Sequence, residues 1–218
     1  RGRERESLLV WTTTPWTLTS NVAAAVGPDL TYVKVRQSGE ILYLSKGALP
    51  ILEGSYNVLE EKQGAELAGL TYDGPFDELE AQQRMGGPQV HRVILWEDVG
   101  EEEGTGIVHI APGCGAEDFE LGREHGFPAI APLDEEGIFV EGFGRFTGTD
   151  VLDSPTRVFE SLREKGLLYQ VEDYTHRYPV CWRCNTELVF RLVDEWFISM
   201  DELRHDMMDV TKQIRWIP

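Results

Sequence analysis

Frequent glycine and proline residues, which interrupt short apolar runs, constrain the fold of this chain most strongly. The 218 residues include 22 Gly and 11 Pro, and turn sequences such as Gly27-Pro28-Asp29 separate runs rich in β-branched and aromatic residues. Such runs are too short for long helices and have the composition of buried strands. We expect strands over six ranges, which are 8–11, 22–26, 31–36, 41–45, 89–99 and 105–111.

Two segments have the end signals of helices. Residues 116–125 begin with acidic residues, end with basic ones and are followed by Gly126, which matches the helix dipole and a glycine stop. A second helix is expected from Ser154 as N-cap, with Pro155 at the first helical position, to Lys165-Gly166. The fold class is therefore mainly β with inserted helices (α+β), in a barrel or a sandwich.

Composition excludes several classes of protein. The chain is 41% hydrophobic with six Trp, nine Phe and seven Tyr, as in a folded globular protein. No apolar run approaches the roughly 18 residues that a membrane span needs. Three cysteines favour a reducing compartment, so we expect a cytoplasmic protein without a membrane partner. The net charge of -18 argues against a strong autonomous binder of nucleic acid.

The character of the chain changes near residue 170, so we divide it into 1–170 and 171–218. In the second part, 188–199 is apolar enough for strands and 201–214 has helical spacing. Cys181 and Cys184 form a C-x-x-C, which is half of a tetrahedral zinc site. A redox pair is the alternative, but the strand-to-helix setting of a thioredoxin motif is absent. We favour half of a zinc knuckle whose other ligands lie outside this chain.

Two segments of residues 1–170 contain candidate functional residues. Thr12, Thr13 and Thr14 follow an expected strand, and their hydroxyls suit a water and a polar substrate, although threonine also simply favours strands. A strand, a glycine-rich loop and a helix carry His109, Cys114 and Asp118. These three could form a base, a nucleophile and an orienting acid, but each alone also has an ordinary structural explanation.

Together these stretches resemble the editing domain that isoleucyl-tRNA synthetases carry inside their catalytic domain, the insertion called connective polypeptide 1. The resemblance covers nearly the whole chain. Its carriers are Trp11-Thr12-Thr13-Thr14-Pro15-Trp16-Thr17 with Asn21, Gly104-Thr105-Gly106-Ile107-Val108-His109 with Ala111-Pro112, Gly115-Ala116-Glu117-Asp118, Asp134-Glu135-Glu136-Gly137, and Tyr178-Pro179 with Cys181-Trp182-Arg183-Cys184 and Asp194-Glu195-Trp196-Phe197-Ile198. The valyl and leucyl relatives usually have Arg where Thr14 stands and an acid where Trp16 stands.

The resemblance implies a distorted β-barrel of the class I aminoacyl-tRNA synthetase editing-domain type over 1–170. Residues 171–218 would be a return segment towards the catalytic domain. The implied activity is post-transfer editing, in which a positioned water hydrolyses valyl-tRNA specific for isoleucine. Valine lacks one methylene of isoleucine, and a binding pocket rejects it by only about 10- to 200-fold, so a second, size-selective site is needed.

The resemblance also implies roles for individual residues. Asp118 would bind the substrate's α-ammonium, and His109 would set the size of the side-chain pocket. Thr12, Thr13 and Thr14 would contact the terminal adenosine and place the attacking water. Trp11 and Thr105 are expected among the residues that bind the substrate.

The expected partners are the acceptor end of the tRNA specific for isoleucine and the catalytic domain of the parent enzyme. Because only the acceptor end enters this domain, other domains can supply most phosphate contacts, which reconciles the negative charge with a tRNA substrate. Editing needs no cofactor, and zinc is expected in the full-length enzyme. The signatures H-I-G-H and K-M-S-K-S are absent, so the chain should not charge tRNA. A non-catalytic tRNA-docking module is the main alternative, and a thiol hydrolase that uses Cys114 is a weaker one.

Overall fold

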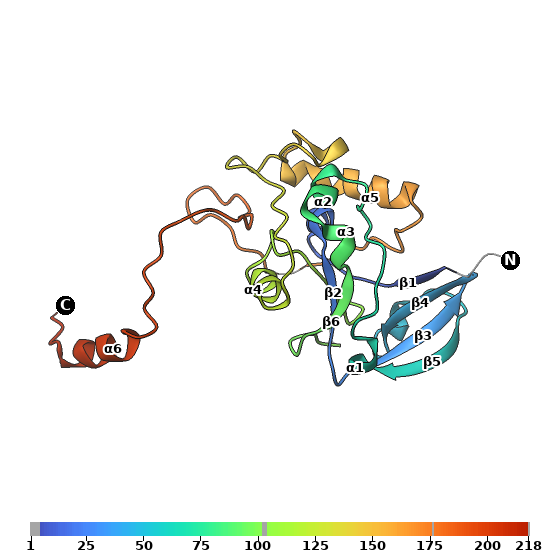
Figure 1. The fold of residues 1–218 in the computed structure, drawn as a ribbon, viewed down its shortest axis with the longest axis horizontal. Coiled ribbons are helices and arrows are strands. Elements are labelled where there is room, and N and C mark those ends of the chain that lie inside the picture. Colours follow the sequence, from blue (N-terminus) through green and yellow to red (C-terminus); the bar gives the residue numbers. More distant parts are fainter. Residues whose placement is uncertain (1–4, 102–103, 176, 218) are drawn as a thin grey trace.

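The computed structural model describes residues 5–101, 104–175 and 177–217, and its strands form two separate sheets (Figure 1). The first sheet has the strand order β1-β4-β3-β5 and the second has the order β6-β2-β7. The strands are β1 (Glu6–Leu8), β2 (Ala23–Val26), β3 (Thr31–Gln37), β4 (Glu40–Ser45), β5 (Asn57–Gln63), β6 (Arg92–Leu95) and β7 (Ile107–Ile110). The expected mixture of sheets and helices is confirmed. No closed barrel is found among the described residues, and helices occupy more of them than strands do.

The first sheet is built on an antiparallel meander. Strand β3 pairs antiparallel with both β4 and β5, and β1 pairs parallel with β4 at the edge. Tight turns such as Ser38-Gly39, in which both residues have positive φ, allow this pairing. Strand β5 was not expected because its sequence, Asn57–Gln63, is polar and its residues are mostly exposed.

The second sheet carries the candidate site. Its central strand β2 is buried at every residue, pairs parallel with β6 and pairs antiparallel with β7. In this register Ala24 lies opposite His109. Small alanine side chains in β2 let neighbouring layers approach this strand closely.

The chain passes from one sheet to the other between Leu8 and Trp11. Leu8 is the last residue of β1 and pairs with Tyr43, whereas Trp11 forms an isolated bridge with Val108 of the second sheet. The expected strand over 8–11 was therefore placed too late, because pairing with β4 begins at Glu6 and ends where the chain turns towards β7.

Helices cover the second sheet and place the segments around it. The α-helices are α1 (Gly64–Leu67), α2 (Glu80–Met85), α3 (Gly87–Val90), α4 (Ala116–His125), α5 (Ser154–Glu164) and α6 (Arg204–Gln213); the 3-10 helices are η1 (Pro15–Ser20), η2 (Leu49–Ile51), η3 (Gly144–Phe146) and η4 (Val151–Asp153). Helix α4 has the expected bounds and ends at Gly126, which is left-handed. Ser154 is the first residue of α5 rather than its cap, because its hydroxyl donates to the Val151 carbonyl at 2.6 Å.

The main core joins the second sheet to the helical layer. Five buried phenylalanines lie in it, and ring contacts join four of them in the order Phe76, Phe146, Phe139 and Phe143. Helix α5 packs against η1, so the helical layer directly supports the segment that follows Trp11. The main core therefore supports the segment that carries part of the candidate site.

Residues after about 170 have little packing of their own. Figure 1 shows them as an extended chain that leads away from the sheets to α6. Trp196 is fully exposed, and Phe197 and Ile198 are 84% and 83% exposed. The expected strands over 188–199 are absent from the described residues, because an apolar run without a pairing partner cannot form a sheet. The division at residue 170 stays a prediction.

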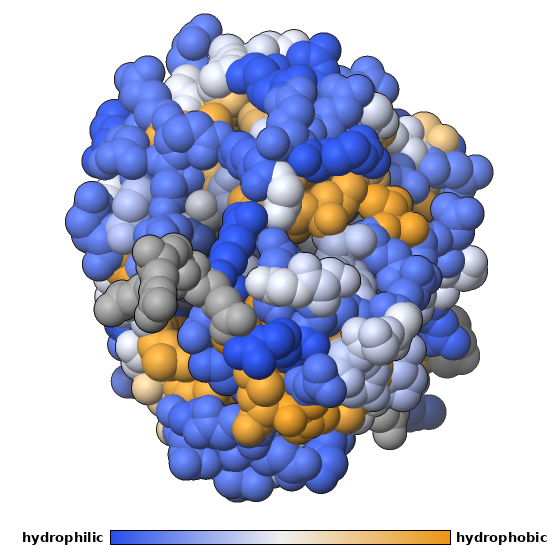
Figure 2. Space-filling view, turned by 90° about the vertical axis from the view of Figure 1, so that its right-hand side faces the viewer, coloured by the Kyte–Doolittle hydropathy of each residue, from blue (hydrophilic) through white to orange (hydrophobic). Residues whose placement is uncertain are grey.

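The surface of the body is mostly polar. Figure 2 shows the face that lies to the right in Figure 1, where hydrophobic side chains form separate patches among hydrophilic ones. No helix in the described part of the chain has the length and apolar character that crossing a membrane requires.

Candidate functional site

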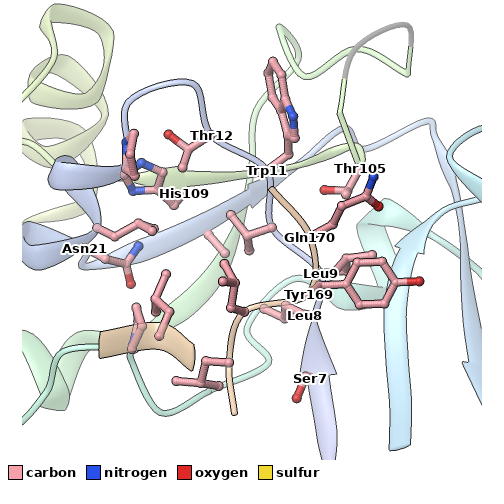
Figure 3. Close-up of a pocket in the computed structure, with 18 of the residues that line it drawn as sticks. Ser7, Leu8, Leu9, Trp11, Thr12, Asn21, Thr105, His109, Tyr169 and Gln170 are labelled. Atoms are coloured by element: carbon pink, nitrogen blue, oxygen red, sulfur yellow. The ribbon is translucent and has the colours of Figure 1, made fainter. Parts of the chain in front are cut away.

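A cavity of about 720 Å³ lies where the chain crosses from the first sheet to the second (Figure 3). Its walls come from residues 5–13 with the start of η1, from residues 70–73 with Pro75, from Thr105 and His109, from helix α5, and from residues 167–172 with Tyr174. Five of the residues selected from the sequence line it, namely Trp11, Thr12, Thr13, Thr105 and His109. Thr14 and Asp118 are not among its lining residues in the described part of the chain.

Two glycines before β7 are needed for this arrangement. Gly104 and Gly106 have φ angles of +65° and +70°, which residues with a side chain rarely adopt. A Cβ atom on Gly104 would lie 2.8 Å from the Trp11 ring, and one on Gly106 would lie 2.4 Å from the Ser45 Cβ. The glycines therefore allow Trp11 to lie against the turn that carries Thr105.

The three threonines form a turn rather than the end of a strand. The Thr14 backbone amide donates to the Thr12 hydroxyl at 3.0 Å, and the Thr13 and Thr14 hydroxyl oxygens lie 3.4 Å apart. The threonines therefore do not continue a strand, because a local side-chain-to-backbone hydrogen bond has replaced extended pairing. Thr12 and Thr13 still contribute polar atoms to the cavity wall.

His109 forms a buried part of the wall. Its Nε2 lies 2.9 Å from the Thr17 hydroxyl oxygen, and its Nδ1 is shielded from solvent without a hydrogen-bond partner among the described residues. Burial lowers the pKa of His109 to about 4. The ring is therefore neutral near pH 7, so it offers the cavity its shape and its hydrogen-bonding groups but no charge.

Asp118 lies on the first turn of α4, beside the end of β7. Its Oδ2 accepts a hydrogen bond from the Ala111 backbone amide at 2.8 Å. Burial raises the pKa of Asp118 to about 6, the amide partly opposes this, and the nearby Glu117 adds to it. Ala111 directly follows β7, so the carboxylate is held at the end of the strand that carries His109, and it is not among the residues that line the described cavity.

Cys114 is held away from the cavity. It is 7% exposed, lies in the main core and does not belong to the described cavity wall. Burial raises the pKa of its thiol, with a further contribution from the charge of Asp118. A nucleophilic cysteine needs a lowered pKa and access to substrate, so this geometry opposes a thiol hydrolase.

Several residues of the cavity wall were not predicted as site residues, and Asn21 and Tyr174 are two of them. The Asn21 Oδ1 accepts from the Tyr72 hydroxyl at 2.8 Å, and the Asn21 Nδ2 donates to the Ala23 carbonyl at 2.8 Å. Asn21 belongs to the motif that carries the resemblance, so the sequence held a signal for it. Tyr174, which meets the Trp11 ring edge-on with centroids 5.1 Å apart, had no such signal because 163 residues separate the pair.

Cys181 and Cys184 lie on a turn closed by a bridge between Val180 and Glu187. The Asn185 amide donates to the Cys181 carbonyl at 2.8 Å. Hydrogen bonds with Thr186, to its hydroxyl first, lower the pKa of Cys184 to about 7. The described residues contain no group of three or more His, Cys, Asp or Glu side chains that could hold a metal. Among the described residues, the two thiols of this turn are therefore at most half of the ligands of a tetrahedral zinc site.

Similarity to known proteins identifies the segment. The chain is 41% identical over 212 residues to the isoleucine–tRNA ligase of Methanothermobacter marburgensis, covering 97% of this chain and 20% of that protein. It is homologous to one segment of isoleucine–tRNA ligase. The ligase of Pyrococcus furiosus is also 41% identical, over 229 residues that include all of this chain and 21% of that enzyme. The chain thus spans about a fifth of these isoleucine–tRNA ligases. No family model matches it.

Solved structures show which fold this ligase segment has. The structure of GlLeuRS-CP1 superposes with a TM-score of 0.57 at 15% identity, covering 77% of this chain and 85% of that one. The editing domain of the P. falciparum cytosolic leucyl-tRNA synthetase gives a TM-score of 0.55 at 11% identity, over 74% and 78% of the two chains. The chain therefore has the fold of these solved synthetase editing domains.

Proposed function

We propose that this chain hydrolyses the aminoacyl ester of valyl-tRNA specific for isoleucine, as the editing part of an isoleucine–tRNA ligase. The observation that carries the proposal is the cavity itself. It brings Thr12 and Thr13 together with the buried, neutral ring of His109 in a chain homologous to that ligase. The fold of a synthetase editing domain supports the same assignment.

The proposed chemistry uses a positioned water and no protein nucleophile. The water attacks the ester carbonyl carbon, the bond to the ribose oxygen breaks, and the ribose oxygen takes up a proton as the free acid leaves. The hydroxyls of Thr12 and Thr13 hold the water and the terminal adenosine, and hydrogen bonds to the developing oxyanion lower the barrier. Asp118, held beside the end of β7, binds the α-ammonium through the carboxylate oxygen that Ala111 does not use.

Selectivity would come from the wall that His109 forms. A rigid buried ring admits valine and excludes the extra methylene of isoleucine by contact. A single binding pocket rejects valine in favour of isoleucine by only about 10- to 200-fold. A second site that admits valine and excludes isoleucine would therefore hydrolyse the smaller, incorrect product. The parts of the ligase outside this chain would hold most of the tRNA, in keeping with a net charge of -18 here.

Comparative deacylation tests the proposal. Valyl-tRNA and isoleucyl-tRNA, both on the tRNA specific for isoleucine, are incubated with the chain, and ester loss is followed at equal concentrations. We expect the valyl ester to be lost at least about tenfold faster than the isoleucyl ester. Retention of valyl-tRNA without hydrolysis would instead identify a docking module, and equal loss of both esters would contradict a size-selective cavity.

We also propose that zinc binds Cys181 and Cys184 when the remaining ligands are supplied from outside this chain. A thiol with a pKa of about 7 loses its proton easily to a metal, and the turn already holds the two cysteines together. Zinc would stiffen the return segment and take no part in hydrolysis. Titration of the isolated chain with Zn²⁺ should therefore show weak binding that Cys184→Ser abolishes, while the deacylation rate stays the same.

A further inference from the structure

Thr17 connects the threonine turn to His109, although it does not touch the cavity. It lies in η1, is 6% exposed and is absent from the described cavity wall. Its hydroxyl oxygen is 2.7 Å from the Thr14 carbonyl oxygen and 2.9 Å from the His109 Nε2. One hydroxyl thus bridges the threonine turn and His109, which lies 92 residues beyond Thr17 in the sequence.

The single hydrogen of that hydroxyl decides which way the two bonds run. If Thr17 donates to the Thr14 carbonyl, its oxygen must accept from His109, which then carries its hydrogen on Nε2. If Thr17 instead donated to Nε2, the hydrogen of His109 would lie on Nδ1. That atom is buried and has no acceptor among the described residues, so the second arrangement leaves a buried donor unpaired.

The same reasoning applies to a doubly protonated ring. Protonation would place a hydrogen on Nδ1 as well, again without an acceptor, and burial would leave the charge uncompensated. A pKa lowered to about 4 agrees with this. Only the neutral ring with its hydrogen on Nε2 avoids an unpaired buried donor, and it leaves Nδ1 as an unpaired acceptor.

We propose that Thr17 is a positioning residue that fixes the tautomer and ring orientation of His109 and thereby sets the amino-acid selectivity of the cavity. The selectivity part rests on the proposed function, whereas the tautomer part does not. Thr17 contributes no atom to the cavity wall, so its effect on a ligand passes through the ring of His109. Its bond to Thr14 keeps the histidine in register with the threonine turn.

Three variants separate this role from ordinary packing. Thr17→Val keeps the size of the side chain and removes the hydroxyl, whereas Thr17→Ser keeps the hydroxyl. Thr19→Val is the matched control, because Thr19 lies in the same helix, is fully buried and donates to the Trp16 carbonyl at 2.8 Å. No hydrogen bond joins Thr19 to His109 in the described structure.

The first measurement is the tautomer of His109 by ¹⁵N NMR of its ring nitrogens, which needs no substrate. We expect the Nε2–H form in the unmodified chain, in Thr17→Ser and in Thr19→Val, and a mixture of tautomers in Thr17→Val. An Nδ1–H ring in the unmodified chain, or an unchanged ring in Thr17→Val, would overturn the proposal. If Thr17→Val does not fold, the tautomer measured in the unmodified chain tests the tautomer part of the proposal by itself.

The second measurement is the ratio of valyl-tRNA to isoleucyl-tRNA hydrolysis. Loss of one hydrogen bond should lower this ratio by roughly fivefold in Thr17→Val, with Thr17→Ser restoring it and Thr19→Val leaving it unchanged. An unchanged ratio together with an altered tautomer would contradict the selectivity role. Absence of hydrolysis in the unmodified chain would contradict the proposed function, and the NMR result would still judge the tautomer.

Discussion

The carboxylate of Asp118 accepts a hydrogen bond from the backbone amide of Ala111 at 2.8 Å. This hydrogen bond joins the first turn of α4 to the residue that follows β7. The contact places a partly buried acid beside the strand that carries His109. Burial disfavours the ionised form of Asp118 and raises its pKa to about 6. A group that is costly to keep ionised suits a role in binding a cation.

Replacement of Asp118 should therefore reduce hydrolysis. Asp118→Asn keeps an oxygen that accepts from Ala111 but loses the charge, so we expect valyl-tRNA hydrolysis to fall roughly 10- to 100-fold. Steady-state deacylation measures this. Glu117→Gln, which neutralises an exposed neighbour on the same turn, is the control and should retain full activity. An unchanged rate in Asp118→Asn would move the ammonium site elsewhere.

The same variant should stabilise the fold at neutral pH. The folded state binds the Asp118 proton more tightly than the unfolded state does, since the pKa rises from 3.8 to about 6. Stability from this proton is present below about pH 4 and is lost as the pH rises to 6. Asp118→Asn should raise the free energy of unfolding at pH 8 by up to about 3 kcal/mol, and by little at pH 4. Urea unfolding at both pH values checks the difference, and equal effects would contradict it.

The pH profile of hydrolysis should show one group near pH 6. Activity requires the ionised carboxylate, so the rate should fall as the pH drops through about 6, and this inflection should vanish in Asp118→Asn. His109, with a pKa of about 4, should add no inflection between pH 5 and 8. A second inflection in that range that disappears in His109→Ala would show that the ring titrates during catalysis.

Removal of the His109 ring should relax the exclusion of isoleucine. His109→Ala enlarges the cavity at the wall, and we expect isoleucyl-tRNA to be hydrolysed within about threefold of the valyl-tRNA rate, because the methylene no longer collides. His205→Ala, an exposed histidine on α6, is the control. If His109→Ala still spares isoleucyl-tRNA, another residue excludes the larger side chain.

The cysteines should differ sharply in reactivity. Iodoacetamide near pH 7 should label Cys184 first, because its pKa is lowered to about 7, and should label the buried Cys114 last. Mass spectrometry of digested peptides gives the order. Cys114→Ala should leave hydrolysis unchanged, and loss of activity in that variant would restore the thiol mechanism.

The sequence predicted elements well where local signals were strong. Helix α4 has its expected bounds because acidic residues begin it and left-handed Gly126 ends it. The strand over 8–11 was misplaced because pairing partners, and not its apolar residues, decided where it begins and ends. The polar strand β5 was missed for the same reason, since its place beside β3 is a tertiary fact.

Some residues of the candidate site could likewise be predicted from the sequence, and others could not. Motif residues such as Thr12 and His109 share a cavity, as the resemblance implied they should lie near one substrate. The contact of Tyr174 with Trp11 and the buried bridge through Thr17 depend on segments far apart in the chain, and spacing cannot reveal them. The roles assigned to Asp118 and to the threonines stay predictions.

A bound-state structure with a non-hydrolysable valyl-adenosine analogue tests the central claim most directly. The account predicts the valyl side chain against the ring of His109, with the adenosine and the carbonyl beside Thr12 and Thr13 and the α-ammonium towards Asp118. An analogue bound outside this cavity, or bound there with its side chain away from His109, would contradict the account.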